Sequence, residues 1–306
     1  MIRTKHILSI SAIAISALMG ISTPASADTI LIQPLFEYPV APDSIQGLKE
    51  KSNYLMDAFW SPFDFKGKST VDQNALNHAL EVYLTPMRFA DEAKSNASMD
   101  ALLQKLAKNP TLLLQFTKAA EENLYGPRAS VWNDQLYLRF LDALIANKGI
   151  KKERKERYRY QAELLRNSLV GTTPKDFEYT TPQGSKAHFY PNGVITVIEF
   201  GNPDCDECRQ AKLKLDTNVG FNTLVDKGAV NVLFINPSPE EGWEKEFEGY
   251  PDKWHFGANE DITDLYDIRT TPCLYVIDDK GKIAAKNITD AEAAMAIAKA
   301  VAESIQ

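Results

Sequence analysis

From about residue 43 to residue 170 the apolar residues recur three and four positions apart, the spacing of helices that each bury one face. Pro110 and the pair Gly126-Pro127 interrupt this pattern where helices begin or end. The spacing predicts an all-α domain of about six helical segments. The clearest apolar sets are Leu76, Ala79, Leu80 and Tyr83; Met99, Leu102, Leu103 and Leu106; and Tyr137, Phe140, Leu141 and Leu144.

The pattern changes near residues 170–176, where Gly, Pro and Thr accumulate in "VGTTPKDFEYTTPQGSK". Beyond this boundary short apolar runs alternate with helical segments, which predicts an α/β fold with a mixed central sheet flanked by helices. We also expect a hairpin in which "PNG" joins strands at 187–190 and 194–200. Further strands are expected at 230–235, 273–279 and 282–285, and helices after the cysteines, at 262–268 and at 290–305.

The amino terminus has the composition of an export signal. Arg3 and Lys5 precede an apolar stretch, and "ASA", ending at Ala27, offers a small-residue cleavage site. We therefore expect a signal peptide at 1–27 and a helical domain at 28–170, with an uncleaved membrane anchor as the alternative. Cleavage would leave a net charge of 34 − 2 − 41 = −9, so nucleic acid is a poor partner.

All three cysteines lie in the last third of the chain, and they are too few for the disulfide scaffold of an exported protein. Cys205 and Cys208 form a CxxC pair between an expected strand and an expected helix. The first amides of that helix favour a thiolate at Cys205, and Cys208, one turn later, can resolve a mixed disulfide. Two alternatives are a purely structural disulfide and a zinc site completed by Cys273 and His255.

Residues 171–306 resemble the thioredoxin-like domain of exported TlpA- and ResA-type bacterial thiol-disulfide oxidoreductases. "GTTPKDFEYTTPQG", "VITVIEF" leading into "CDEC", and "YDIRTTPCLYVIDDKGKI" carry the resemblance. It implies that Pro272 is cis, that the backbone of Thr271 pairs with a substrate strand, and that Glu199 is a buried acid. Such an acid can shuttle the proton of Cys208, although a glutamate near a strand end can instead face solvent.

The sequence departs from that family around the cysteines. Asp204 replaces the usual tryptophan before the first cysteine, and Asp206 and Glu207 separate the pair. Carboxylates near the first sulfur oppose its thiolate, which disfavours the reduced form and predicts a reductant rather than a DsbA-like oxidant. Cys273, directly after Pro272, is expected to be a small buried hydrophobe, or alternatively a third redox thiol.

The N-terminal region resembles, in "FWSPFDF" and "SVWNDQLYLRFLDALI", a helical region of unassigned function that precedes thioredoxin-like domains in some exported bacterial proteins. The chain is thus predicted to be a periplasmic thiol-disulfide oxidoreductase acting on protein thiols or disulfides, with an unidentified redox partner. No cofactor and no stable membrane insertion are expected. The alternatives are a redox-inactive binding module that uses the helical domain for a partner, and a metal carrier supported by His255 alone.

Overall fold

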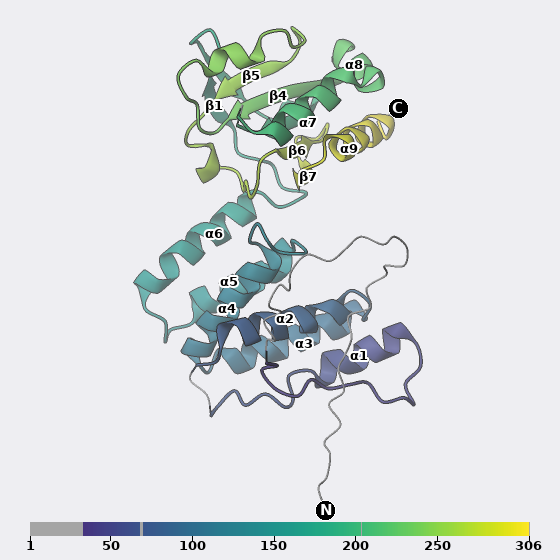
Figure 1. Ribbon diagram of the computed structural model, residues 1–306, viewed down its shortest axis with the longest axis vertical. Helices are drawn as coiled ribbons and strands as arrows, with labels where there is room; N and C mark the ends of the chain where they lie inside the picture. The colour runs from purple at the N-terminus through teal and green to yellow at the C-terminus, as the bar shows by residue number, and fades with distance from the viewer. Residues whose placement is uncertain (1–32, 68–69, 203, 306) are drawn as a thin grey trace, which may run out of the picture. The chain divides into compact units, whose positions relative to one another are not determined.

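The structure is a computed structural model, which describes residues 33–67, 70–202 and 204–305. The expected signal peptide at 1–27 lies outside the described residues. Six α-helices and one 3₁₀-helix form the N-terminal part of the described chain, as the apolar spacing predicted (Figure 1). They are α1 (Leu48–Ala58), α2 (Gln73–Met87), α3 (Glu92–Leu106), α4 (Pro110–Leu124), α5 (Asp134–Ala146), η1 (Lys152–Lys155) and α6 (Glu156–Asn167).

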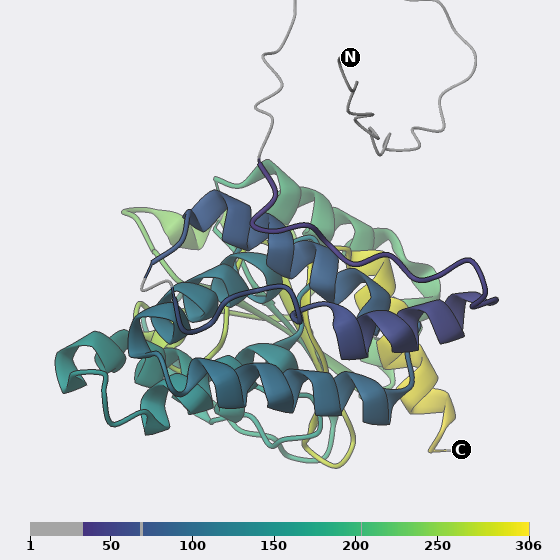
Figure 2. The same ribbon diagram turned by 90° about the horizontal axis from the view of Figure 1, so that it is seen from below.

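Polar residues fix where three of these helices begin. The side-chain oxygens of Asp72, Asn109 and Asn133 accept backbone N–H groups in the first turns of α2, α4 and α5. These bonds satisfy donors that have no partner within the helix. The helices, seen from below in Figure 2, enclose one hydrophobic cluster in which the predicted stripes are buried, except for the partly buried Leu103.

The C-terminal part is built on a seven-stranded mixed sheet with the order β2-β1-β5-β4-β3-β6-β7. Strand β4 runs parallel to β3 and β5, and the other neighbours are antiparallel. The strands are β1 (Phe177–Thr180), β2 (Lys186–Phe189), β3 (Ile195–Phe200), β4 (Val230–Asn236), β5 (His255–Ala258), β6 (Cys273–Ile277) and β7 (Ile283–Ile288). The helical elements are α7 (Asp206–Thr217), α8 (Val219–Asp226), η2 (Trp243–Phe247), η3 (Ile262–Asp264) and α9 (Ala291–Glu303).

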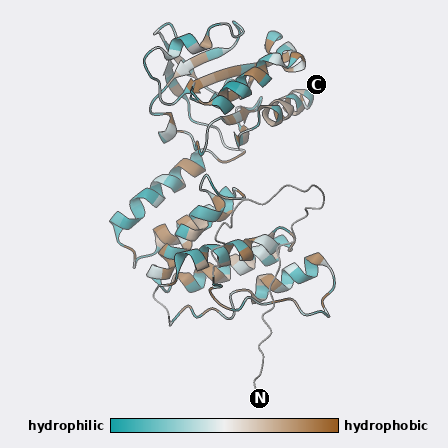
Figure 3. Cartoon of the chain, in the orientation of Figure 1, coloured by the Kyte–Doolittle hydropathy of each residue, from teal (hydrophilic) through white to brown (hydrophobic). Residues whose placement is uncertain are grey.

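Two hydrophobic clusters cover the two faces of this sheet, and the inner strands are accordingly apolar in Figure 3. Residues of α7, α8 and α9 pack into the first cluster. The second face is covered by the segment around η3, where only three residues are helical instead of the expected 262–268. We expected helices on both faces of the sheet, but the α-helices of this region, α7, α8 and α9, pack on one face.

The expected hairpin around "PNG" is wrong. Strand β2 pairs with β1, through a turn in which Gly184 has a φ of +75°. Strand β3 lies between β4 and β6 instead. All six residues of β3 are buried, so it needs a partner on each side, whereas the mostly polar, half-exposed β2 suits an edge. The sequence also gave no sign of β5, a four-residue strand in a polar segment.

Candidate active site

Cys205 lies just beyond the carboxyl end of β3 and is the N-cap residue of α7. The backbone N–H of Cys208 donates to its sulfur over 3.2 Å. Cys205 is partly exposed, whereas Cys208, one turn into the helix, is buried. The first sulfur can therefore be reached from solvent, whereas the second cannot.

Burial raises the pKa of Cys208 to about 12, and the adjacent Cys205 and Glu199 add to this effect. A thiol with such a pKa stays protonated at neutral pH, so its attack on a disulfide requires a base. Cys208 thus has the properties of a resolving rather than an attacking residue.

Glu199 is buried in the middle of the sheet, with only 1% of its surface exposed, so it does not face solvent. Burial raises the pKa of Glu199 to about 8, against the opposing charge of Lys212. A Cβ atom at Gly201 would lie 3.2 Å from both Glu199 Oε1 and Cys208 Sγ. The carboxyl group and the second thiol therefore border the same glycine, and a side chain there would crowd both.

Sequence reasoning missed Lys212, a buried lysine four residues after Cys208 on the same face of α7. Its ammonium nitrogen lies 5.0 Å from the ring centroid of Phe247 and 6.0 Å from those of Phe234 and Tyr250. Cation–π contacts of this kind compensate in part for burying the charge. Its spacing from Cys208 was the signal that could have identified it, but the rings come from remote segments.

The Thr271-Pro272 peptide bond is cis and faces the first cysteine. The carbonyl oxygen of Thr271 is 3.8 Å from Cys205 Sγ. Thr271 is exposed while Pro272 is buried. An exposed backbone beside an accessible sulfur is a surface on which an extended peptide can lie.

The three acidic residues beside the cysteines do not all contact the Cys205 sulfur. Glu207 Oε2 lies 3.7 Å from Cys205 Sγ. Asp206 instead pairs with Arg209 on the exposed side of α7, and Asp204 is exposed. One of the three carboxylates expected near the sulfur contacts it.

Cys273 is buried in the cluster on the second face of the sheet, with its sulfur 3.2 Å from Asn287 Oδ1. Its neighbour Leu274 points to the opposite face, where Ala211 of α7 packs. Burial raises the pKa of the Cys273 thiol. These features fit the expectation of a small buried hydrophobe.

The described residues contain no cluster of three or more His, Cys, Asp or Glu side chains suited to a metal ion. His255, the proposed fourth zinc ligand, lies on β5, two strands away from the β3 end that carries the cysteines.

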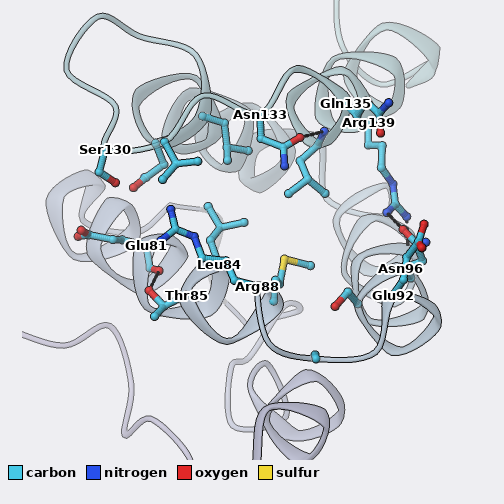
Figure 4. Close-up of a pocket in the computed structure, with 17 residues that line it drawn as sticks. Glu81, Leu84, Thr85, Arg88, Glu92, Asn96, Ser130, Asn133, Gln135 and Arg139 are labelled. Carbon is cyan, nitrogen blue, oxygen red and sulfur yellow. Dashed lines mark hydrogen bonds between the residues drawn. The ribbon is translucent and has the colours of Figure 1, made fainter. Parts of the chain in front are cut away.

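The helical region holds a separate cavity of about 400 Å³, shown in Figure 4. Leu84 of α2, the α2 C-cap residue Arg88, Asn96 of α3, Asn123 of α4 and Arg139 of α5 are among the residues that line it. Because four helices contribute, periodicity along the chain could not predict it. The Arg139 guanidinium at this cavity forms a salt bridge with Asp100.

The fold and the geometry at Cys205 define a thioredoxin-like protein with an N-terminal helical region. The chain belongs to the family described as "Domain of unknown function (DUF5106)", whose model matches residues 14–168. None of the curated proteins matches the chain. Within the described ranges no helix is long and apolar enough to cross a membrane.

Several solved structures are similar to this chain. A thioredoxin-like protein from Bacteroides caccae is 19% identical, with a TM-score of 0.72 over 87% of this chain and 98% of its own. The thioredoxin domain of a thiol-disulfide oxidoreductase from Bacteroides vulgatus is 21% identical, covering 44% of this chain and 98% of its own, with a TM-score of 0.38. A conserved protein of unknown function from Bacteroides fragilis is 30% identical, covering 40% and 93%, with a TM-score of 0.37. The first of these confirms the expected thioredoxin-like fold.

Proposed function

We propose that the protein is an exported thiol-disulfide oxidoreductase that reduces disulfides in protein substrates. The observation that carries this proposal is the position of Cys205. Its sulfur is partly exposed, accepts an N–H at the start of α7 and lies 3.8 Å from the Thr271 carbonyl. This combination supports a nucleophilic thiolate next to a backbone that can bind an extended substrate.

The reaction has two exchange steps. The Cys205 thiolate attacks one sulfur of a substrate disulfide, forms a mixed disulfide and releases the other sulfur as a thiolate, which takes a proton. The Glu199 carboxylate then accepts the proton of Cys208, and the resulting thiolate attacks Cys205. The second substrate sulfur leaves as a thiolate and takes a proton, and two electrons have passed from the protein dithiol to the substrate. An external dithiol must reduce the Cys205–Cys208 disulfide again.

The same surroundings favour reduction of substrates over oxidation. Glu207 contacts the first sulfur, and the second thiol is buried with a raised pKa. The raised pKa of Cys208 disfavours negative charge on the reduced pair, and a less stable reduced form gives a more reducing couple. Thr271 and Pro272 are proposed to bind the substrate backbone.

We further propose the domain bounds 1–27, 28–170 and 171–306 for signal peptide, helical domain and thioredoxin-like domain. Separate hydrophobic clusters on the two sides of residue 170 support the second boundary. Export to the periplasm rests on the sequence of residues 1–27, and an oxidising compartment gives a CxxC reductase its substrates.

A Cys208→Ser variant tests the proposed function directly. Without the resolving thiol, the mixed disulfide at Cys205 cannot collapse, so a disulfide-bonded peptide is expected to stay covalently attached. Mass spectrometry of the unreduced protein should find one peptide per chain, released by dithiothreitol and joined to Cys205. If no adduct forms on the folded variant at any peptide concentration, the redox-inactive binding module becomes the better description.

A further inference from the structure

Arg269 and Lys286 are cations buried inside the compact unit Gln33–Gln306, with side chains only 3% and 7% exposed. Both bind the same two carboxylates, Asp267 and Asp134. The Lys286 ammonium lies 2.7 Å from each carboxylate, and the Arg269 guanidinium lies 2.7 Å from Asp267 and also pairs with Asp134. Two positive and two negative charges cancel, the condition under which burying them is tolerated.

The helical region contributes two aromatic rings to the surroundings of Arg269 as well as the Asp134 carboxylate. The guanidinium carbon lies 4.5 Å from the ring centroid of Tyr125 and 5.1 Å from that of Trp132. Tyr125 is the C-cap residue of α4, and Trp132 and Asp134 flank Asn133, the N-cap residue of α5. Cation–π contacts are strongest where water is excluded, as it is around this side chain. The ends of two helices thus clamp one arginine of the thioredoxin-like region.

That arginine belongs to the loop that faces the first cysteine. Arg269 stands two residues before Thr271, whose carbonyl oxygen lies 3.8 Å from Cys205 Sγ. The loop 269–272 has no strand or helix hydrogen bonding of its own. Its position therefore depends on what holds its two ends.

The other end of the loop is tied to the same carboxylate. Cys273 Sγ lies 3.2 Å from Asn287 Oδ1, and Asn287 Nδ2 donates to Asp267 Oδ2 over 3.1 Å. The Tyr275 hydroxyl donates to the carbonyl oxygen of Asp267 over 2.8 Å. The buried ion cluster and these bonds together fix the residues before and after the loop.

We propose that the helical region positions the loop 269–272 for substrate, with Arg269, Asp134 and Trp132 as positioning residues. This inference rests on the proposed function and gives the helical region a part in it. The loop must hold a substrate strand so that its disulfide meets the Cys205 sulfur in line. Displacing reacting atoms by about 1 Å can cost on the order of a hundredfold in rate.

The test compares two disulfides with the full reduced protein. One is a disulfide-bonded peptide, which uses the loop backbone, and the other is bis(2-hydroxyethyl) disulfide, which has no peptide backbone. Asp134→Asn is expected to lower the second-order rate with the peptide at least about tenfold and to leave the rate with the small disulfide within about twofold. Trp132→Leu, which keeps all four charges, should do the same if Asp134→Asn does not fold.

The matched control is Asp142→Asn, in the same helix, which removes only an exposed pair with Arg166. It should behave like the wild type with both disulfides. Folded Asp134→Asn and Trp132→Leu variants that react with the peptide at the wild-type rate would overturn the inference, as would an equal loss with both disulfides. A wild-type protein that reacts with neither disulfide overturns the proposed function itself.

Discussion

A Cys205→Ser variant is expected to lose disulfide reduction by at least about a thousandfold, because a hydroxyl group cannot replace a thiolate as the attacking nucleophile. The change removes one partly exposed sulfur and should leave folding intact. The rate is measured as reduction of a disulfide-bonded protein in the presence of excess dithiothreitol, with the uncatalysed rate subtracted.

Cys273→Ser provides the matched control. Its sulfur is buried on the second face of the sheet, and a serine hydroxyl can still donate to Asn287 Oδ1, so this variant should keep the wild-type rate in its folded fraction. Residual activity above a tenth of the wild-type rate in Cys205→Ser, or a comparable loss in folded Cys273→Ser, would contradict the assignment of Cys205 as the attacking residue.

The second large effect is expected at Glu199, where Gln should slow the exchange while stabilising the fold. Removing a general base costs on the order of a hundredfold or more, here in the resolving step that needs the Cys208 proton removed. In the wild type this step should accelerate with rising pH up to about 8, the raised pKa of Glu199. Glu199→Gln should lack that rise.

The stability effect follows from the same pKa. Glu199 has a pKa of about 8 in the folded protein against an ordinary value of 4.5. Between these pH values the folded state holds a proton that the unfolded state has released, so this residue lowers the free energy of unfolding as pH rises. The slope is about 1.4 kcal/mol per pH unit, and it ends near pH 8.

Urea unfolding of the reduced proteins at pH 5 and pH 8 measures this difference. The free energy of unfolding of Glu199→Gln minus that of the wild type should be larger at pH 8 than at pH 5. Glu199→Asp, which keeps an acid at this position, is the control and should retain the pH dependence. A wild type and Glu199→Gln with parallel pH profiles would show that the glutamate does not titrate as described.

Much of the site could be predicted because its parts are close in the sequence. Cys205 and Cys208 stand at a strand-to-helix junction, and Glu199 occupies the strand before it. The apolar stripes in the helical region identified its core because a helix repeats its buried face locally. The Thr271-Pro272 segment was predicted from family resemblance, since nothing in its spacing places it beside Cys205.

What the sequence did not predict depends on contacts between distant residues. The pairing of β2 with β1 is decided by the burial of β3 on both faces, which local alternation does not encode. Arg269 and Asp134 are 135 positions apart. Each looks like an ordinary surface charge in the sequence, and only the folded chain shows that they are buried together.

The redox potential of the Cys205–Cys208 pair tests the central claim most directly. The protein is equilibrated in glutathione and dithiothreitol buffers, and the free thiols are trapped with a mass tag and counted. We expect a reversible two-electron transition near the thioredoxin value of about −270 mV, with Cys273 unchanged throughout. A value near the −120 mV of DsbA would contradict the reductant, and a pair that never forms or never releases a disulfide would contradict the oxidoreductase itself.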